Sequence, residues 1–304
     1  MNFATAKEMS PYLEEPKAMP VGTPGKMGYL YLGFELDGDG KSIMRDLDRH
    51  APLIVQQELY FDEGMPEMPC VYILSSGGPN VDGDRYEQHF VVREGAYAHI
   101  STGAATKLAE MRYNYSGLKQ VFELEENAYL EYLPEPTIPC RHTRFIADTA
   151  IRVAPSATLF YSEVYMSGRK YFDKGETFQY DILSVCSHAE RPDGERLFRE
   201  KFIIRPEVCP PESLGAMNGY DVFANVIVLT PPERADRIYE ATPAFIDRDR
   251  RLAAGITRLP NNAGLLYKVL GEETGPVKKL IREFCSSVRQ EVKGKPLPEE
   301  FPWR

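Results

Sequence analysis

The sequence predicts a mostly β fold, with a stacked, β-helical body of hairpins and about two helices in the C-terminal third. Three observations predict it. Short apolar segments with the two-residue alternation of strands occur along most of the chain. Strand–turn–strand units recur in the middle of the chain at a spacing of about 30 residues. Helical periodicity is confined to the C-terminal third.

A proline-rich arm and two strand candidates precede the repeat. Residues 1–27 contain four prolines and two glycines, which interrupt regular structure. We therefore expect an extended N-terminal arm or a tail that wraps around a partner. Residues 28–36 alternate with the period of a strand, and residues 53–61 are a second strand candidate.

The internal repeat occupies the middle of the chain. Each unit has an apolar segment, a tight turn, an alanine and a second apolar segment; the three alanines are Ala96, Ala128 and Ala157. Two strands joined by a short turn are typical of a hairpin. Units that cannot each bury a face alone tend to stack on one another. We therefore expect a layered or helical arrangement of hairpins.

The same repeat predicts that three loop segments lie side by side at one edge of the stack. It aligns Thr102, Pro134 and Glu163, each just past the second strand of its unit. The segments 102–107 and 133–139 should then be neighbours of segment 163–169, although each is about 30 residues from the next.

The remaining strands and both helices follow the repeat. Strand patterns cover residues 177–185, 197–205 and 221–230, and a short helix runs from residue 231 to about 240. The strongest helical pattern covers residues 275–292 of a C-terminal helix that we place at 274–293.

That C-terminal helix should begin with Thr274 as N-cap. Its apolar face includes Val277, Ile281 and Phe284, and we expect Arg289 on the polar side. Residues 297–304 are expected to form a docked tail. No linker requires a second domain, so we predict a single domain over residues 1–304.

The composition argues against several classes of protein. Hydrophobic residues make up 43% and charged residues 27% of the 304 residues, as in ordinary globular proteins. A net charge of −9 argues against general binding of nucleic acid, which usually needs a basic face. Because we find neither a membrane-spanning run nor a secretory signal, we expect a cytoplasmic protein without membrane attachment. Five cysteines without a CxxC pair predict free thiols.

Catalytic motifs are not recognisable. Residues 38–42 end like a phosphate-binding loop, but Glu35 stands where the first glycine is needed, which favours a polar hairpin turn. GxSxG, HxH and HExxH patterns do not occur. The alternative of an enzyme or binding module for a small molecule, in an edge cleft of a β scaffold, thus has no nucleophile–base pair to support it.

Possible metal-binding residues gather around the predicted edge. Carboxylates occur in the glycine loop at residues 82–84, around segment 133–139, and in or shortly after segment 163–169. Cys140 and His142 lie two residues apart just beyond segment 133–139. Carboxylates hold divalent cations weakly, whereas thiolate and imidazole suit late first-row metals. Solvated loop charge is the alternative interpretation. The candidates for a transient cation path are Asp82, Asp84, Glu131, Glu135, Cys140, His142, Glu163 and Glu176.

These segments, in this order and spacing, resemble the urease accessory proteins of the UreD/UreH family. The resemblance covers nearly the whole chain. It rests on residues 75–78, 83–85, 102–107, 133–139, 161–169, 258–261 and 297–304. The chain departs from many relatives at residues 79–82, and relatives vary at the positions of residues 140–142, which affects details of a metal path rather than the family.

The resemblance implies a β-helical chaperone that is not an enzyme. It implies binding to apo-urease and to the UreF protein, which recruits the GTPase UreG. It also implies assistance to nickel insertion into urease, with an internal tunnel as the path, no tightly bound cofactor, and nickel only in transit. Transit needs ligands that release the ion, which scattered carboxylates do better than a His/Cys cage. Our hypothesis is that Asp84, Glu135 and Glu163 line or border this path.

Overall fold

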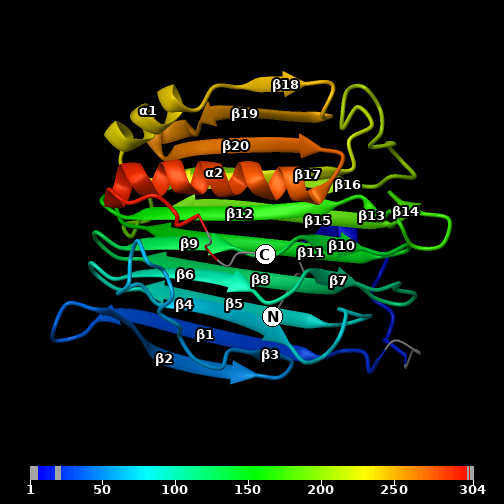
Figure 1. The fold of residues 1–304 in the computed structure, drawn as a ribbon. Coiled ribbons are helices and arrows are strands. Elements are labelled where there is room, and N and C mark those ends of the chain that lie inside the picture. The colour runs from blue at the N-terminus through cyan, green and yellow to red at the C-terminus, as the bar shows by residue number, and fades with distance from the viewer. Residues whose placement is uncertain (1–5, 18–21, 300, 302–304) are drawn as a thin grey trace.

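The computed structural model, which describes residues 6–17, 22–299 and 301, packs two large β-sheets face to face (Figure 1). Sheet 1 has the strand order β16-β15-β11-β8-β5-β1-β2. Its strands are β1 (Met27–Leu36), β2 (Ser42–His50), β5 (Arg85–Val92), β8 (Ser116–Leu124), β11 (Arg144–Val153), β15 (Ile182–Glu190) and β16 (Arg196–Ile204).

Sheet 2 has the order β18-β19-β20-β17-β12-β9-β6-β4-β3, with β7 and β10 attached beside β12. Its strands are β3 (Leu53–Ile54), β4 (Cys70–Ser75), β6 (Tyr97–Thr102), β7 (Thr106–Leu108), β9 (Tyr129–Leu133), β10 (Thr137–Pro139), β12 (Thr158–Met166), β17 (Val222–Leu229), β18 (Phe245–Asp247), β19 (Leu252–Arg258) and β20 (Gly264–Gly271). A separate pair joins β13 (Gly168–Arg169) to β14 (Glu176–Thr177). The helices are α1 (Pro232–Ala241) and α2 (Thr274–Lys293), with short 3₁₀ turns at Lys7–Met9 and Pro260–Asn262. The mostly β fold and the two C-terminal helices are thus as predicted.

The repeat forms the stacked body, but its units are not hairpins. In each unit the first strand lies in sheet 1 and the second in sheet 2, so β5, β8 and β11 pair in parallel with one another, as do β6, β9 and β12. The expected pairing within a unit was therefore wrong. The tight turn instead carries the chain from one sheet to the other, which lets both strands direct apolar side chains into a shared interior. Ala96, Ala128 and Ala157 are buried where the sheets approach at these turns.

The register confirms the predicted edge. Tyr97 pairs with Tyr129, and Tyr129 with Thr158, which are the offsets that align Thr102 with Pro134 and Glu163. Beyond the strands, β7 pairs with β10, and β10 meets β12 through Thr137 and Tyr165. The three segments are therefore neighbours in space, although Glu163 lies within β12 rather than just past a strand as expected.

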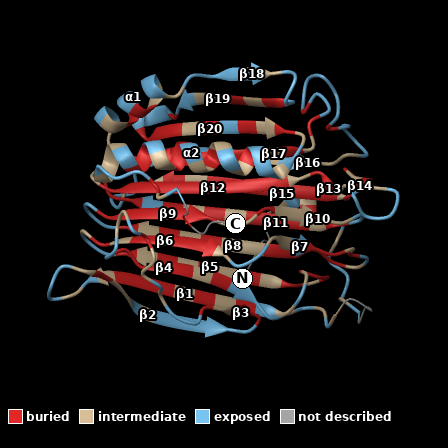
Figure 2. Ribbon diagram, viewed as in Figure 1, coloured by how far each residue is buried: buried red, intermediate tan, exposed pale blue. Residues whose placement is uncertain are grey.

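Two predicted strands are shorter than expected. Within residues 53–61 only β3 is a strand, and Leu59 forms an isolated bridge to Cys70. The segment 177–185 is divided, because β14 ends at Thr177 and β15 begins at Ile182. Strand interiors are largely buried, whereas β2 and β18 at two sheet edges are exposed (Figure 2).

Helix α2 covers the outer face of sheet 2 (Figure 1). Val277, Ile281, Phe284 and Val288 are buried against that face, as the periodicity predicts. The N-cap is Glu273 rather than Thr274, which is already helical, and no side chain caps the helix start.

Arg289 corrects the predicted polar side of α2, because its side chain is fully buried. Its Nε and Nη2 each lie 2.6 Å from an oxygen of Glu131 on β9, and Nη1 pairs with Asp62. His99 Nδ1 lies 2.8 Å from the same Glu131 carboxylate. Burial alone would raise the pKa of Glu131, but the ion pair with Arg289 and the contact with His99 hold it well below its usual value. Residue 289 lies four positions after the buried Cys285, so the helical period places both on the same face of α2. Only the charge of Arg289 favoured an outward side chain.

Both chain ends pack against the body where they are described. Met9 of the N-terminal arm is buried with Tyr115, Ile146 and Ile182 against sheet 1. The arm at residues 6–17 is thus folded onto its own chain, while residues 1–5 and 18–21 lie outside the described residues.

The C-terminal tail is docked, as expected, up to its last described residue. Phe301 is buried, its ring lies 4.7 Å from that of His99, and its carbonyl accepts a hydrogen bond from Arg282 (2.8 Å). Residues 300 and 302–304 lie outside the described residues. In the described part of the chain, no helix is long and apolar enough to cross a membrane.

Replacing Arg289 by methionine should lower the free energy of unfolding by about 3–5 kcal/mol, because Glu131 and Asp62 would remain buried without their cation. Urea denaturation of the purified protein measures the loss. The control is Arg237→Met, which removes a half-exposed pair with Glu291 and should cost no more than about 1 kcal/mol. Equal losses in the two variants would contradict the anchoring role of Arg289.

Candidate functional site

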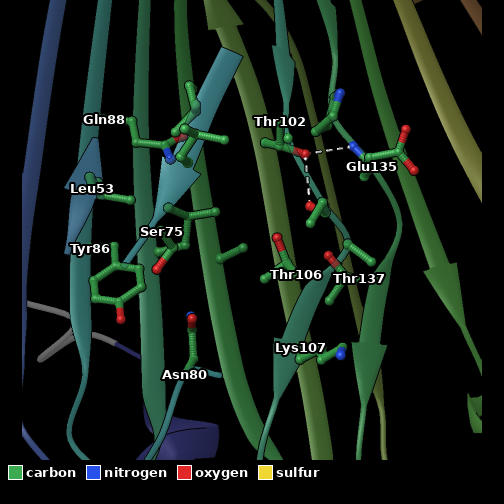
Figure 3. Close-up of a pocket in the computed structure, with 18 of the residues that line it drawn as sticks. Leu53, Ser75, Asn80, Tyr86, Gln88, Thr102, Thr106, Lys107, Glu135 and Thr137 are labelled. Carbon is green, nitrogen blue, oxygen red and sulfur yellow. Dashed lines mark hydrogen bonds between the residues drawn. The ribbon is translucent and has the colours of Figure 1, made fainter. Parts of the chain in front are cut away.

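A cavity of about 610 Å³ lies between the two sheets. It is placed where β4, β6 and β9 of sheet 2 end in loops and where β5, β8 and β11 of sheet 1 begin. Its rim is formed by residues 75–80, 102–107 and 134–137, so it opens at the edge that the repeat predicts (Figure 3). A cavity of this volume is in the range of small-ligand sites.

The inner wall of the cavity is a hydrogen-bonded ladder of polar side chains. Gln88 and Gln120 occupy the same rung of β5 and β8 and face Tyr132 of sheet 2. Gln120 Nε2 donates to Gln88 Oε1 (2.8 Å) and to the Tyr132 hydroxyl (2.7 Å). Tyr132 stacks on Tyr161, with ring centroids 5.4 Å apart. These bonds satisfy buried polar groups and fix the side chains in place.

Glu163 is the buried carboxylate of the cavity. It lies on β12, and its Oε1 accepts hydrogen bonds from the hydroxyls of Tyr161 (2.7 Å) and Tyr165 (3.3 Å). Desolvation by burial raises the pKa of Glu163 to about 7, although the two hydroxyls act in the opposite direction. Near neutral pH this group can therefore exchange its proton for another cation.

Glu135 is the carboxylate of the rim. Its backbone N–H donates to Thr102 Oγ1 (2.8 Å), which ties two of the edge segments together (Figure 3). Both carboxylate oxygens accept from Nζ of Lys278 on α2, at 2.7 and 2.8 Å.

Asp82 and Asp84 hold loops and are not among the residues that line the cavity. Asp82 accepts backbone N–H groups from residues 112–114. Asp84 accepts the backbone N–H groups of Lys26 and Val81 and pairs with Lys26 Nζ at 2.8 Å. It touches the cavity wall only through the Tyr86 hydroxyl, at 3.2 Å.

The other four candidates lie away from the cavity. Glu131 faces the outside of sheet 2, in the Arg289 cluster. Glu176 is held by both Nε and Nη2 of Arg169, at 2.7 Å each, and exposed His142 lies 3.1 Å from Asp181. Burial raises the pKa of the half-buried Cys140 thiol. Within the described residues, no group of three or more His, Cys, Asp or Glu residues could hold a metal ion.

Sequence reasoning missed most of the cavity wall, yet the repeat carried a signal for it. Gln88 and Gln120 are separated by the same offset as Ala96 and Ala128, and Tyr132 and Tyr161 by the offset of the next unit. Extending the alignment of the repeat to these polar positions would have placed Gln88 beside Gln120 and Tyr132 beside Tyr161. Lys278 carried no such signal.

Comparison with known proteins identifies the family. Residues 26–304 match the family described as UreD urease accessory protein. The chain belongs to the UreD family. It is 47% identical over 298 residues to urease accessory protein UreD 2 of Brucella suis biovar 1 (strain 1330), covering 98% of each chain. It is 44% identical over 305 residues to urease accessory protein UreD of Yersinia enterocolitica serotype O:8, covering 98% of this chain and 93% of the relative. Because UreD proteins are accessory proteins, the chain is not an enzyme, and the enzyme alternative is set aside.

The raised pKa of Glu163 makes a pH-dependent contribution to stability. Between its unfolded pKa near 4.5 and its folded pKa of about 7, the folded state binds more protons than the unfolded chain. The free energy of unfolding therefore falls as pH rises through this window. Glu163→Gln should remove that fall. The free energy of unfolding of the variant should therefore rise relative to that of wild type by up to about 3 kcal/mol between pH 4 and pH 8.

Urea denaturation at both pH values measures the difference. Glu176→Gln is the control of opposite sign, because Arg169 holds the pKa of Glu176 below its usual value. The free energy of unfolding that Glu176→Gln loses relative to wild type should be greatest at pH 8 and should shrink as pH falls. A Glu163→Gln difference that does not change with pH would contradict the assignment.

Proposed function

We propose that this protein acts in urease maturation in the cytoplasm, as a scaffold that assists insertion of nickel into apo-urease. In this proposal it binds apo-urease and UreF, and UreF recruits the GTPase UreG, which supplies nucleotide hydrolysis. Its membership of the UreD family over residues 26–304 supports the role, as do relatives named as urease accessory proteins over nearly their full length.

We further propose that the cavity between the sheets is part of the nickel path. The observation that carries this step is that the cavity combines carboxylates at two depths, Glu135 at the rim and Glu163 inside, with a ladder of amide and hydroxyl groups. Oxygen ligands bind nickel less tightly than a thiolate or imidazole cage, so they favour transfer over storage. Asp84, part of our initial hypothesis, is left out of the path because it does not line the cavity, and its carboxylate holds Lys26 and the backbone of Val81.

Co-expression with apo-urease and the partner proteins tests the path. The double variant Glu135→Gln/Glu163→Gln should lower the nickel content of urease about tenfold, the order by which losing one supporting group weakens metal binding. Nickel is measured by elemental analysis of purified urease, and assembly by co-purification of the complex. Both substitutions preserve side-chain size, so the complex should still assemble.

The matched control is Glu190→Gln, at the half-exposed end of β15, where the carboxylate pairs with Arg152. It should leave the nickel content unchanged. Full nickel loading with the double variant would exclude these carboxylates from the path. Failure of apo-urease to co-purify with the wild-type protein would contradict the scaffold role itself.

A further inference from the structure

The rim carboxylate of the cavity is already occupied by a cation of the protein. Lys278 lies in the first turns of α2, 143 residues from Glu135, and its ammonium lies 2.7 and 2.8 Å from the two carboxylate oxygens. The side chains are only 15% and 14% exposed. The pair is therefore withdrawn from most of the solvent screening that weakens surface ion pairs.

The two partners differ in freedom. Glu135 is fixed through its backbone by Thr102, and it lies in the edge segment between β9 and β10. Lys278 reaches it from another element on a flexible four-carbon side chain. The backbone of α2 is itself fixed three turns later, where Arg289 is buried against Glu131. If the pair opens, the lysine side chain is the group that can move, while the carboxylate stays at the rim.

We propose that Lys278 is the resident counter-ion of Glu135, which a divalent cation displaces when it enters the cavity. This inference rests on the proposed cation path and adds the residue that sets the affinity of its entrance. The ammonium keeps the largely buried carboxylate neutralised when no metal is present, and an incoming cation with two charges replaces it at the same oxygens. Because the lysine competes for the same oxygens, the cation binds more weakly and is released more easily than it would be at a carboxylate without a counter-ion.

A lysine suits this role better than an arginine. An ammonium is a compact point charge on a mobile chain, whereas a guanidinium clamps a carboxylate with two parallel hydrogen bonds. Replacing Lys278 by methionine should therefore strengthen cation binding, and replacing it by arginine should weaken it. A purely structural ion pair would not change cation affinity in opposite directions in these two variants.

Titration calorimetry of the full-length protein with nickel(II) alone tests the inference. We expect Lys278→Met to bind nickel about tenfold more tightly than wild type and Lys278→Arg to bind it more weakly. Lys279→Met is the matched control, because Lys279 is the neighbouring lysine of α2 and its side chain is 77% exposed. It should bind like wild type. Urea denaturation of each variant verifies that it is folded.

Glu135→Gln separates the two possible failures. If Glu135→Gln weakens nickel binding but both Lys278 variants bind like wild type, the counter-ion inference is overturned and the cation path stands. If Glu135→Gln binds like wild type, Glu135 is not a cation ligand, and the rim part of the path fails together with the inference. If Lys278→Met does not fold, a Lys278→Arg affinity equal to or above wild type overturns the inference by itself.

Discussion

On strand β9, Glu131 and Tyr132 are neighbours in sequence and face opposite sides of sheet 2. Glu131 points outward and binds Arg289 of α2, whereas Tyr132 points inward and closes the polar wall of the cavity. Both positions depend on the parallel register in which Tyr97, Tyr129 and Thr158 stand side by side. A slip of one residue would exchange the two faces, burying the carboxylate in the cavity wall and removing the anchor of the helix.

The register explains why the two sides of sheet 2 are chemically distinct but mechanically joined. Inside, like residues from successive units stack on one another, as Tyr132 of β9 does on Tyr161 of β12. Outside, α2 spans from the Arg289 cluster to Lys278 at the cavity rim. One helix thus fixes the outer face and supplies the cation that neutralises the entrance.

The carboxylates of Glu131, Glu163 and Glu135 differ in how their charge is compensated. Glu131 is fully paired with Arg289, and its pKa is lowered, which is typical of a structural group. Glu163 receives only hydroxyl hydrogen bonds, and burial raises its pKa to about 7. Glu135 is paired with a lysine that reaches it from another element. In our proposal, Glu163 and Glu135 rather than Glu131 make the transient contact with the cation.

Much of the fold and one edge of the site could be predicted from the sequence because they follow from local periodicity. The 30-residue repeat aligned Thr102, Pro134 and Glu163, and the alternation and helical patterns located most strands and both helices. The local pattern does not determine which segments pair with one another. A tight turn is compatible with a hairpin or with a crossing between sheets, and only burial of both strands in one interior decides between them.

The sequence by itself thus determined the repeat, the edge and the set of available carboxylates. Only the tertiary structure decided which carboxylates lie at the cavity and which are held elsewhere, because their partners come from other parts of the chain. Asp84 is occupied by Lys26, Glu131 by Arg289, and Glu176 by Arg169. Glu135 and Glu163 remain at the cavity, since an ion pair or a desolvated site depends on approach in space, which spacing along the sequence does not encode.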